Sequence, residues 1–272
     1  MKLQYSIPSY QRAVKTFFCA LSAHYPSNKI LQRNVYISEN APSDLILSNL
    51  VINSFSIPND STLVLRQKSS INMCSNWLAS LDMGTELIVK LLFSDDSVLS
   101  EPQLSNFLLL EQDPHCVALV SPVIISFDSG HSDSYRLANK QLKIRASDYI
   151  SLLLRRPDLV ALSPSAYYFK RSDFFHSLNY LLTLAPLKQC TFNGAGIDSL
   201  AMMTLFAKSD SYIIYDPSAL VQFGASNDSI TINDLRSGRN LVQTNRNIAH
   251  SFFISTGFEV HYQRFLSFRQ KH

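Results

Sequence analysis

Strand-like and helical segments alternate along the first third of the sequence, and this alternation constrains the fold more than any other feature. The helical stretches are residues 12–25, 44–52 and 71–81, and the strand-like segments are residues 3–7, 34–37, 61–65 and 86–93. The first strand is expected to end at Pro8, and the second at a turn over residues 38–43. This alternation predicts βαβ units and an α/β fold with a mainly parallel sheet flanked by helices.

Polar and aromatic residues follow each of the four predicted strands. They occupy residues 8–10, 38–40, 66–68 and 94–96. Ligands of such sheets bind outside the carboxyl ends of the strands. The sequence therefore predicts a binding site along this edge.

The second half of the sequence is less regular. Expected helices cover residues 103–112, 147–155, 173–184 and 197–207; expected strands cover 117–125, 167–170 and 212–215; a long loop covers 126–139. Further helices are expected after residue 232, ending in an aromatic and basic tail. We expect one domain over residues 1–231 and a C-terminal helical extension over residues 232–272.

Composition excludes several functions. Charged residues make up 17% of the 272 residues and the net charge is +3, too weak for a nucleic-acid-binding protein. Four separated cysteines without a CxxC pair argue against a zinc site, and Cys19 and Cys74 fit a reduced core. No apolar run has the length of a signal peptide or a membrane span. We expect a cytoplasmic protein that can contact the inner face of a membrane peripherally.

Common phosphate-binding and hydrolase motifs are missing from the sequence. It contains no GxGxxG, GxxxxGK[ST] or GxSxG pattern, and its histidines lack metal-ligand spacing. A nucleotide would have to be held in another way.

Asp95 and Asp96 end the apolar strand-like segment at residues 86–93. Two adjacent carboxylates are costly to bury unless they are paired. Oxygen ligands of this kind suit Mg²⁺ or Mn²⁺ on a diphosphate. A helix N-cap followed by an acidic residue in the first turn explains the pair equally well.

Asp198 follows the glycine-containing segment 194–196 and begins a predicted helix. An acidic residue in this position is usually a helix cap. It could also serve as a general base if an acceptor hydroxyl lay within hydrogen-bond reach.

Several short segments, taken together, resemble the inverting family 2 glycosyltransferases of the GT-A fold, especially those that build bacterial O-antigens and capsules. They are SIPSYQRA at residues 6–13, SENAPSD at 38–44, SNW at 75–77, KLLFSDD at 90–96, SAYYFKR at 165–171 and IDSL at 197–200. The first is similar to the family's I-P-T-Y-N-R, the second to D-N-A-S-x-D, the third to G-N-W and the fourth to its DxD strand. The segments keep the family's order over residues 3–231.

This resemblance implies a nucleotide-sugar and acceptor-binding catalytic domain over residues 1–231. The implied donor-binding residues are Pro8, Tyr10, Arg12, Glu39, Lys68, Asn76, Asp95 and Asp96. Tyr10 would stack on the base, Glu39 would accept the imide hydrogen, and Asp96 would hold Mn²⁺ or Mg²⁺ on the diphosphate. Asp198 would be the general base.

The implied reaction moves a sugar from a nucleotide-sugar, expected to be a UDP-sugar, to an acceptor hydroxyl with inversion. The acceptor would be a glycan or an undecaprenyl-diphosphate-linked chain, in the synthesis of O-antigen, capsule or lipooligosaccharide.

The sequence departs from the family pattern at three positions. Ser94 replaces the first DxD acid, Ser226 stands where a metal-binding histidine is usual, and Gly224 stands where an arginine is usual. A weakly bound or dispensable metal is therefore expected. Two alternatives stay open: a catalytically inactive GT-A-fold binding subunit, and a nucleotidyltransferase.

Overall fold

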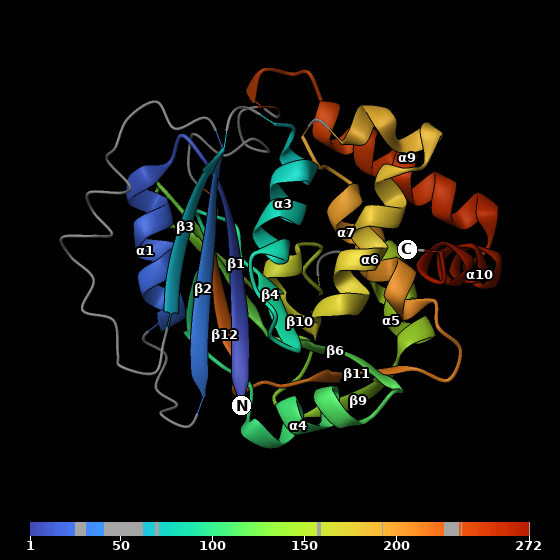
Figure 1. Cartoon of the computed structure of the whole chain (residues 1–272), viewed down its shortest axis with the longest axis horizontal. Helices are drawn as coiled ribbons and strands as arrows, with labels where there is room; N and C mark the ends of the chain where they lie inside the picture. The colour runs from blue at the N-terminus through green and yellow to red at the C-terminus, as the bar shows by residue number, and fades with distance from the viewer. Residues whose placement is uncertain are drawn as a thin grey trace.

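The computed structural model describes residues 1–24, 31–40, 62–68, 71–156, 159–191, 193–225, 234 and 236–271. Within this part, an eight-stranded sheet has the order β3-β2-β1-β4-β10-β6-β11-β9 and carries helices on both faces (Figure 1). Its strands are β1 (Lys2–Tyr10), β2 (Gln32–Asn40), β3 (Thr62–Lys68), β4 (Ile88–Leu91), β6 (Cys116–Val120), β9 (Leu142–Arg145), β10 (Tyr167–Lys170) and β11 (Tyr212–Tyr215).

The first half of this sheet is the predicted parallel one. β3, β2, β1 and β4 pair in parallel, whereas β10 runs antiparallel to both β4 and β6. β11 then pairs in parallel with β6. All four residues of β4 are buried, which agrees with the mostly apolar sequence there; Lys90 is the exception.

The helices cover the two faces of the sheet unequally. α1 (Ala13–His24) and α4 (Leu104–Gln112) pack on one face, where Phe17 and Phe107 join a core with the side chains of Leu3 and Ile7. The opposite face is covered by α3 (Met73–Asp82), α5 (Ala146–Arg155), α6 (Arg171–Leu182) and α7 (Ile197–Phe206). Apolar side chains alternate along the strands because successive residues point to opposite faces.

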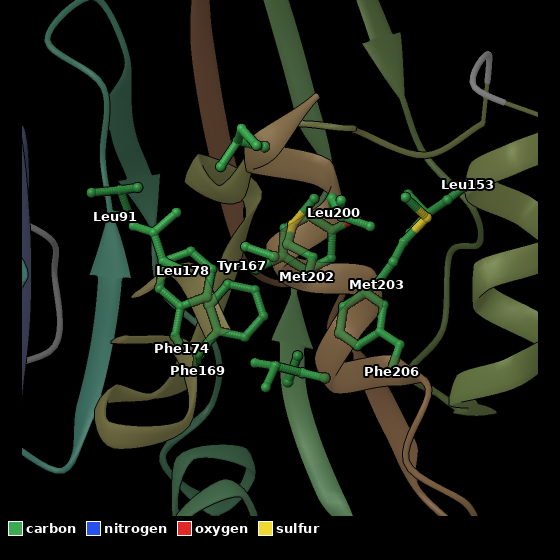
Figure 2. Close-up of a cluster of buried hydrophobic side chains, with 14 of the residues drawn as sticks. Leu91, Leu153, Tyr167, Phe169, Phe174, Leu178, Leu200, Met202, Met203 and Phe206 are labelled. Carbon is green, nitrogen blue, oxygen red and sulfur yellow. The ribbon is translucent and has the colours of Figure 1, made fainter. Parts of the chain in front are cut away.

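Aromatic rings pack together with leucine and methionine side chains in the core between β10 and the helices α6 and α7 (Figure 2). Phe169 stacks on Phe174 with ring centroids 4.5 Å apart, and on Tyr167 at 5.7 Å. Phe206 of α7 packs against the same group, with its ring 6.4 Å from that of Phe169. These rings hold α7, which has Asp198 in its first turn, against the sheet.

The C-terminal helices α9 (Leu241–Thr256) and α10 (Phe258–Arg269) confirm the helices expected after residue 232. Phe253 and Phe265 are buried in the same core as α6 and α7. Arg269 also forms an ion pair of 2.7 Å with Asp173 at the start of α6. Both helices therefore belong to the packed body of the molecule (Figure 1).

The first strand continues through Pro8 to Tyr10, so the expected end at Pro8 is wrong. β4 pairs with β1 only as far as Ser6 and Leu91. Beyond that pair the described residues place no strand against this side of β1, so the missing N–H of Pro8 removes no ladder hydrogen bond. β2 likewise runs on to Asn40, because it pairs with a strand on each side over its whole carboxyl end.

The strand expected at residues 117–125 is two strands that belong to different sheets. It breaks at Pro122, after which β7 (Val123–Phe127) enters a four-stranded sheet with the order β5-β12-β7-β8. Its other strands are β5 (Ser97–Ser100), β8 (Ser132–Tyr135) and β12 (Leu220–Ala225). β8 lies within the predicted loop at residues 126–139, which is therefore partly wrong. The helix predicted at residues 44–52 lies outside the described residues.

Candidate functional site

The carboxyl ends of β1, β2 and β3 lie in register at one edge of the larger sheet. Ser9 pairs with Glu39, and Asn40 pairs with Tyr10 on one side and Lys68 on the other. β4 runs parallel to β1 and ends on the same side. The structure thus brings the predicted strand-end residues to a common edge; their roles stay predictions.

The turn after β1 presents one aromatic side chain to solvent. Tyr10 is 49% exposed, whereas Pro8 is buried within the strand. Gln11 then adopts a left-handed backbone with φ of 52°, which turns the chain toward Arg12 and α1. A non-glycine residue in this region is strained and is common at functional turns. The exposed Tyr10 ring is free to stack on a planar ligand.

Two predicted donor-binding residues are buried at the strand ends. Glu39 is 5% exposed. Asn76 of α3 is 3% exposed; it accepts a hydrogen bond from the Ser38 hydroxyl (2.7 Å) and donates one to the Ser9 carbonyl (3.0 Å). Asn76 therefore ties α3 to the ends of β1 and β2. Lys68 ends β3, and its side chain lies outside the described part of the chain.

Asp95 is paired with the turn that follows β1. Its Oδ2 atom accepts a hydrogen bond of 2.8 Å from Nη1 of Arg12. The two side chains retain 15% and 18% exposure, respectively, so the ion pair lies just below the surface. Both residues belong to the predicted donor site, and the structure places them in direct contact.

Asp96 lies deeper than Asp95. It is 5% exposed, and its Oδ1 atom accepts a hydrogen bond of 3.3 Å from the Gly224 N–H. Burial raises the pKa of Asp96 well above its usual value, and the Asp95 carboxylate raises it further. The Ser165 hydroxyl, the Gly224 N–H and the charge of Lys90 oppose this rise in the Asp96 pKa.

Gly224 of β12 has a spatial reason to be glycine. A Cβ atom at this position would lie 2.3 Å from the Asp95 carbonyl oxygen, so no larger residue fits without moving the backbone. In the comparison with the family pattern, Gly224 stands where an arginine is usual. Its close approach to Asp95 joins the smaller sheet to the acidic turn, and no local sequence signal reveals it.

Lys90 is a second residue that the sequence did not single out. It is fully buried in β4, and its Nζ atom has no hydrogen-bond partner among the described residues. The ammonium group lies 4.1 Å from the centre of the Tyr168 ring. Burial lowers the pKa of Lys90 to about 7, against the opposing charges of Asp96 and Glu101. The signal in the sequence is a cation inside an apolar strand.

Asp198 stands in the first turn of α7 and is held through one oxygen. Its Oδ1 atom accepts hydrogen bonds from the N–H groups of Gly196 (3.0 Å) and Ser199 (2.7 Å). Its Oδ2 atom accepts none from the residues that the structure describes. Burial raises the pKa of Asp198, whereas Arg246 and the backbone donors lower it. The arrangement combines a local cap with a free carboxylate oxygen.

Helix α9 lies against the same turn. His250 Nε2 and the Ser199 hydroxyl are 3.0 Å apart, and Asn245 Nδ2 donates a hydrogen bond of 3.1 Å to Asn193 Oδ1. Arg246, one turn before His250, acts electrostatically on Asp198. No site residue is predicted in this helix from the sequence; the only signal there is the four-residue spacing of Arg246 and His250, which places both on one helical face.

Trp77 of α3 connects the two acidic regions. Its ring lies 5.3 Å from that of Phe93, which precedes the Asp95 turn. Its other end approaches Gly194, where a Cβ atom would lie 2.2 Å from the indole. The Trp77 side chain therefore packs against both Phe93 and Gly194, which are far apart in the sequence. Asp198 follows Gly194 by four residues.

Two other acids, Asp173 at the start of α6 and Asp216 after β11, have structural partners. Asp173 is paired with Arg269. Asp216 is fully buried and accepts hydrogen bonds from the Gln103 N–H (2.8 Å), the Asn106 amide (2.7 Å) and the Ser218 N–H (2.9 Å). Asp216 thus anchors the start of α4 to the loop after β11.

Carboxylates for a divalent cation are few. The described residues contain no group of three His, Cys, Asp or Glu side chains able to hold a metal ion. Asp96 offers an oxygen to such a cation, while Asp95 already binds Arg12. This set fits Mg²⁺ or Mn²⁺ only as ions that keep water and bind mainly through substrate phosphates. Ser226 lies outside the described residues.

Comparisons with known proteins give matches to solved structures but none to sequence families. No protein-family model and no curated protein matches the sequence. Among solved structures, S. aureus TarS 1–349 in complex with UDP aligns with 90% of this chain at 15% identity and a TM-score of 0.55. The same fragment with UDP-GlcNAc aligns with 100% of the chain at 12% identity and a TM-score of 0.57. The fold is GT-A-like.

The alignment covers only part of these structures. It spans 65% of the TarS fragment bound to UDP and 39% of a longer TarS chain. No helix in the described part of the chain has the length and apolar character needed to cross a bilayer.

Proposed function

We propose that this chain is a glycosyltransferase that moves a sugar from a nucleotide-sugar, a UDP-sugar, to an acceptor hydroxyl during surface-polysaccharide synthesis. The observation that carries the proposal is the packing of the Asp95–Asp96 turn and the Asp198 turn around Trp77 within a GT-A-like fold. Since a fold alone does not define an activity, these residues supply the argument. TarS, whose fold is similar, has been crystallised with UDP and with UDP-GlcNAc.

The donor site in this proposal is the carboxyl edge of the parallel strands. Tyr10 stacks on the base, and Glu39 at the end of β2 accepts its imide hydrogen. Arg12 and Asp95 form one hydrogen-bonded unit beside the phosphates and ribose. Asn76 keeps α3 fixed to these strand ends. Lys68 extends this row of polar residues at the end of β3.

Asp96 would hold Mn²⁺ or Mg²⁺ on the diphosphate. A cation there would act as a Lewis acid and stabilise the negative charge of the leaving group. The Gly224 N–H fixes one carboxylate oxygen of Asp96 in place. With so few other carboxylates nearby, binding through Asp96 is modest and depends on the donor phosphates.

The chemical step is a single displacement that inverts the anomeric carbon. Asp198 takes the proton of the acceptor hydroxyl on its Oδ2 atom while Oδ1 stays bound to the Gly196 and Ser199 N–H groups. The acceptor oxygen forms its bond to the anomeric carbon as the bond to the diphosphate breaks. The electron pair leaves with the diphosphate, so no covalent enzyme intermediate forms. The acceptor is a glycan or an undecaprenyl-diphosphate-linked chain.

A second candidate is a binding subunit without catalytic activity. Its support is the ion pair that occupies Asp95 and the raised pKa of Asp96, which together disfavour a strong metal site. This candidate binds a nucleotide-sugar and transfers nothing. Turnover measurements therefore separate it from the transferase.

The proposal is tested by nucleotide-dependent thermal stability, with UDP-, GDP- and dTDP-sugars compared at millimolar concentration. A ligand that binds only the folded state stabilises it by ~2.7 kcal/mol at a hundredfold excess over its dissociation constant. We expect a UDP-sugar to give the largest rise in melting temperature. The absence of any shift with all three nucleotides would refute the donor site.

A further inference from the structure

Helix α9 touches the turn that precedes Asp198. Gly196 has φ of 86°, and a Cβ atom there would lie 2.8 Å from Cβ of Ala249 and 3.0 Å from Cα of Arg246. Glycine is required both by this backbone conformation and by the close approach of α9. The position of Arg246 relative to the turn is therefore fixed by backbone contact.

The side chain of Arg246 has no hydrogen-bond or ion-pair partner among the described residues, although it is partly buried beside the Asp198 turn. Its Nε atom is buried without a hydrogen bond, and the guanidinium makes no ion pair within the described part of the chain. Arginine stays charged at all ordinary pH values. A partly buried cation of this kind is costly unless it balances a nearby negative charge. The carboxylate of Asp198 is such a charge, and Arg246 is the cation that acts on it.

We propose that Arg246 is a positioning residue for Asp198, and that its positive charge keeps this carboxylate ionised and ready to accept a proton. The inference rests on the proposed function, in which Asp198 is the general base. It makes α9 a working part of the site, although this helix lies in the C-terminal extension.

The other titratable groups around Asp198 cannot take this role. Burial raises the pKa of the Cys74 thiol on α3, and Asp198 raises it further, so the thiol is neutral. Burial and Arg246 lower the pKa of His250 on α9, so its imidazole is neutral as well. His250 contacts Ser199 rather than the carboxylate. Without Arg246, burial of Asp198 would be opposed only by backbone N–H groups.

The decisive experiment is a pH titration of the Asp198 carboxyl by carbon-13 NMR, assigned with the Asp198→Asn spectrum. It compares the wild type with Arg246→Met, Arg246→Lys and the exposed control Arg264→Met. We expect Arg246→Met to raise the Asp198 pKa, because an opposite charge favours the ionised form. Arg246→Lys keeps the positive charge and should therefore bring the Asp198 pKa most of the way back to its wild-type value. Arg264→Met should leave the titration of Asp198 unchanged.

Turnover gives a second readout. In Arg246→Met the acidic limb of the kcat profile should move to higher pH by the same amount, with kcat recovering above it. A uniform loss at every pH, with an unmoved NMR titration, would overturn the inference and leave Arg246 a packing residue. If Arg246→Met does not fold, Arg246→Gln provides the same comparison. Because the NMR measurement needs no substrate, a shifted titration without sugar transfer would count against the proposed function alone.

Discussion

Asp95 and Asp96 are neighbours in the sequence, but their surroundings differ. Asp95 shares its charge with Arg12 near the surface, whereas Asp96 is buried with a backbone N–H on one oxygen. An ion pair and a buried carboxylate respond differently to substitution. The difference makes the contribution of each residue to stability measurable.

Asp96→Asn is expected to stabilise the folded protein at neutral pH while it abolishes most donor-dependent turnover. The folded-state pKa of Asp96 is raised, so its stabilising protonated form is present at low pH and is lost as the pH rises through that value. Asparagine removes the cost of the buried charge and keeps an oxygen for Gly224. Urea unfolding at neutral pH and near pH 4 measures the effect.

The gain in free energy of unfolding should be largely lost near pH 4, where Asp96 is protonated in the folded state and about half protonated in the unfolded state. Asp95→Asn is the matched control, because it breaks the ion pair with Arg12 and should give no gain. Lower stability of Asp96→Asn at neutral pH would contradict the prediction.

Asp198→Asn is expected to lower turnover at least a hundredfold and to leave donor affinity near the wild-type value. General-base assistance contributes ~10²–10⁴-fold, and an amide cannot accept the proton. Its oxygen can still accept the Gly196 and Ser199 hydrogen bonds, so the turn should keep its shape. Steady-state kinetics and donor titration measure the two effects separately.

Asp173→Asn is the control for this prediction, since Asp173 is paired with Arg269 away from the proposed chemistry. Near-normal turnover in Asp198→Asn together with a large loss in Asp173→Asn would show that the base has been wrongly assigned.

Elements with strong local patterns were predicted well. Helical spacing predicted α1, α3 and α7 within one or two residues, and the aromatic run of β10 was predicted at its full length. β5, β8 and β12 were missed, because these short strands are partly exposed and are defined by pairing with distant segments. The contacts of Gly224 and Arg246 were missed for the same reason, because they join distant segments. The Gly224 N–H, for example, donates a hydrogen bond to Asp96 across 128 positions of the sequence.

The contact between α3 and the turn before α7 gives a prediction at the level of elements. Gly194→Ala should destabilise the fold by about 2–4 kcal/mol, since it combines a left-handed backbone with overpacking against Trp77. The displaced turn carries Asp198, so turnover should fall more than donor affinity. Chemical denaturation and kinetics provide both numbers.

Gly130→Ala is the matched control. Gly130 has φ of 82°, close to the 71° of Gly194, but a Cβ atom there would meet nothing within 4 Å. Only the backbone cost of ~1–2 kcal/mol should remain. Equal losses in the two variants would remove Trp77 from the explanation.

On the scale of the whole molecule, the C-terminal helices combine packing with a charged surface. The sequence showed aromatic residues mixed with cations and left open a membrane contact or a packed helix. Phe253 and Phe265 are buried, and the other tail rings are partly buried against the same core. What remains exposed near the chain end includes Arg264 and Lys271. Ile254 and Val260 are exposed as well, so any membrane contact by the tail would combine these two aliphatic side chains with the charges.

We predict weak, salt-sensitive binding of the protein to vesicles that contain anionic lipids. Each basic residue near such a surface contributes ~1 kcal/mol, and salt screens this attraction within about 10 Å at 0.1 M. The double substitution Arg264→Glu and Lys271→Glu should abolish flotation with the vesicles. Substitution is preferable to truncation, because removal of the last turns would delete the buried Phe265.

The control reverses two exposed charges elsewhere, Lys2→Glu and Lys140→Glu, and changes the net charge equally. If binding depends on the tail, the control protein should still float with anionic vesicles at low salt, and neither protein should float with neutral ones. Equal loss of flotation in both double variants would point to net charge alone. Unchanged flotation of the Arg264 and Lys271 variant would exclude these two charges as the membrane contact.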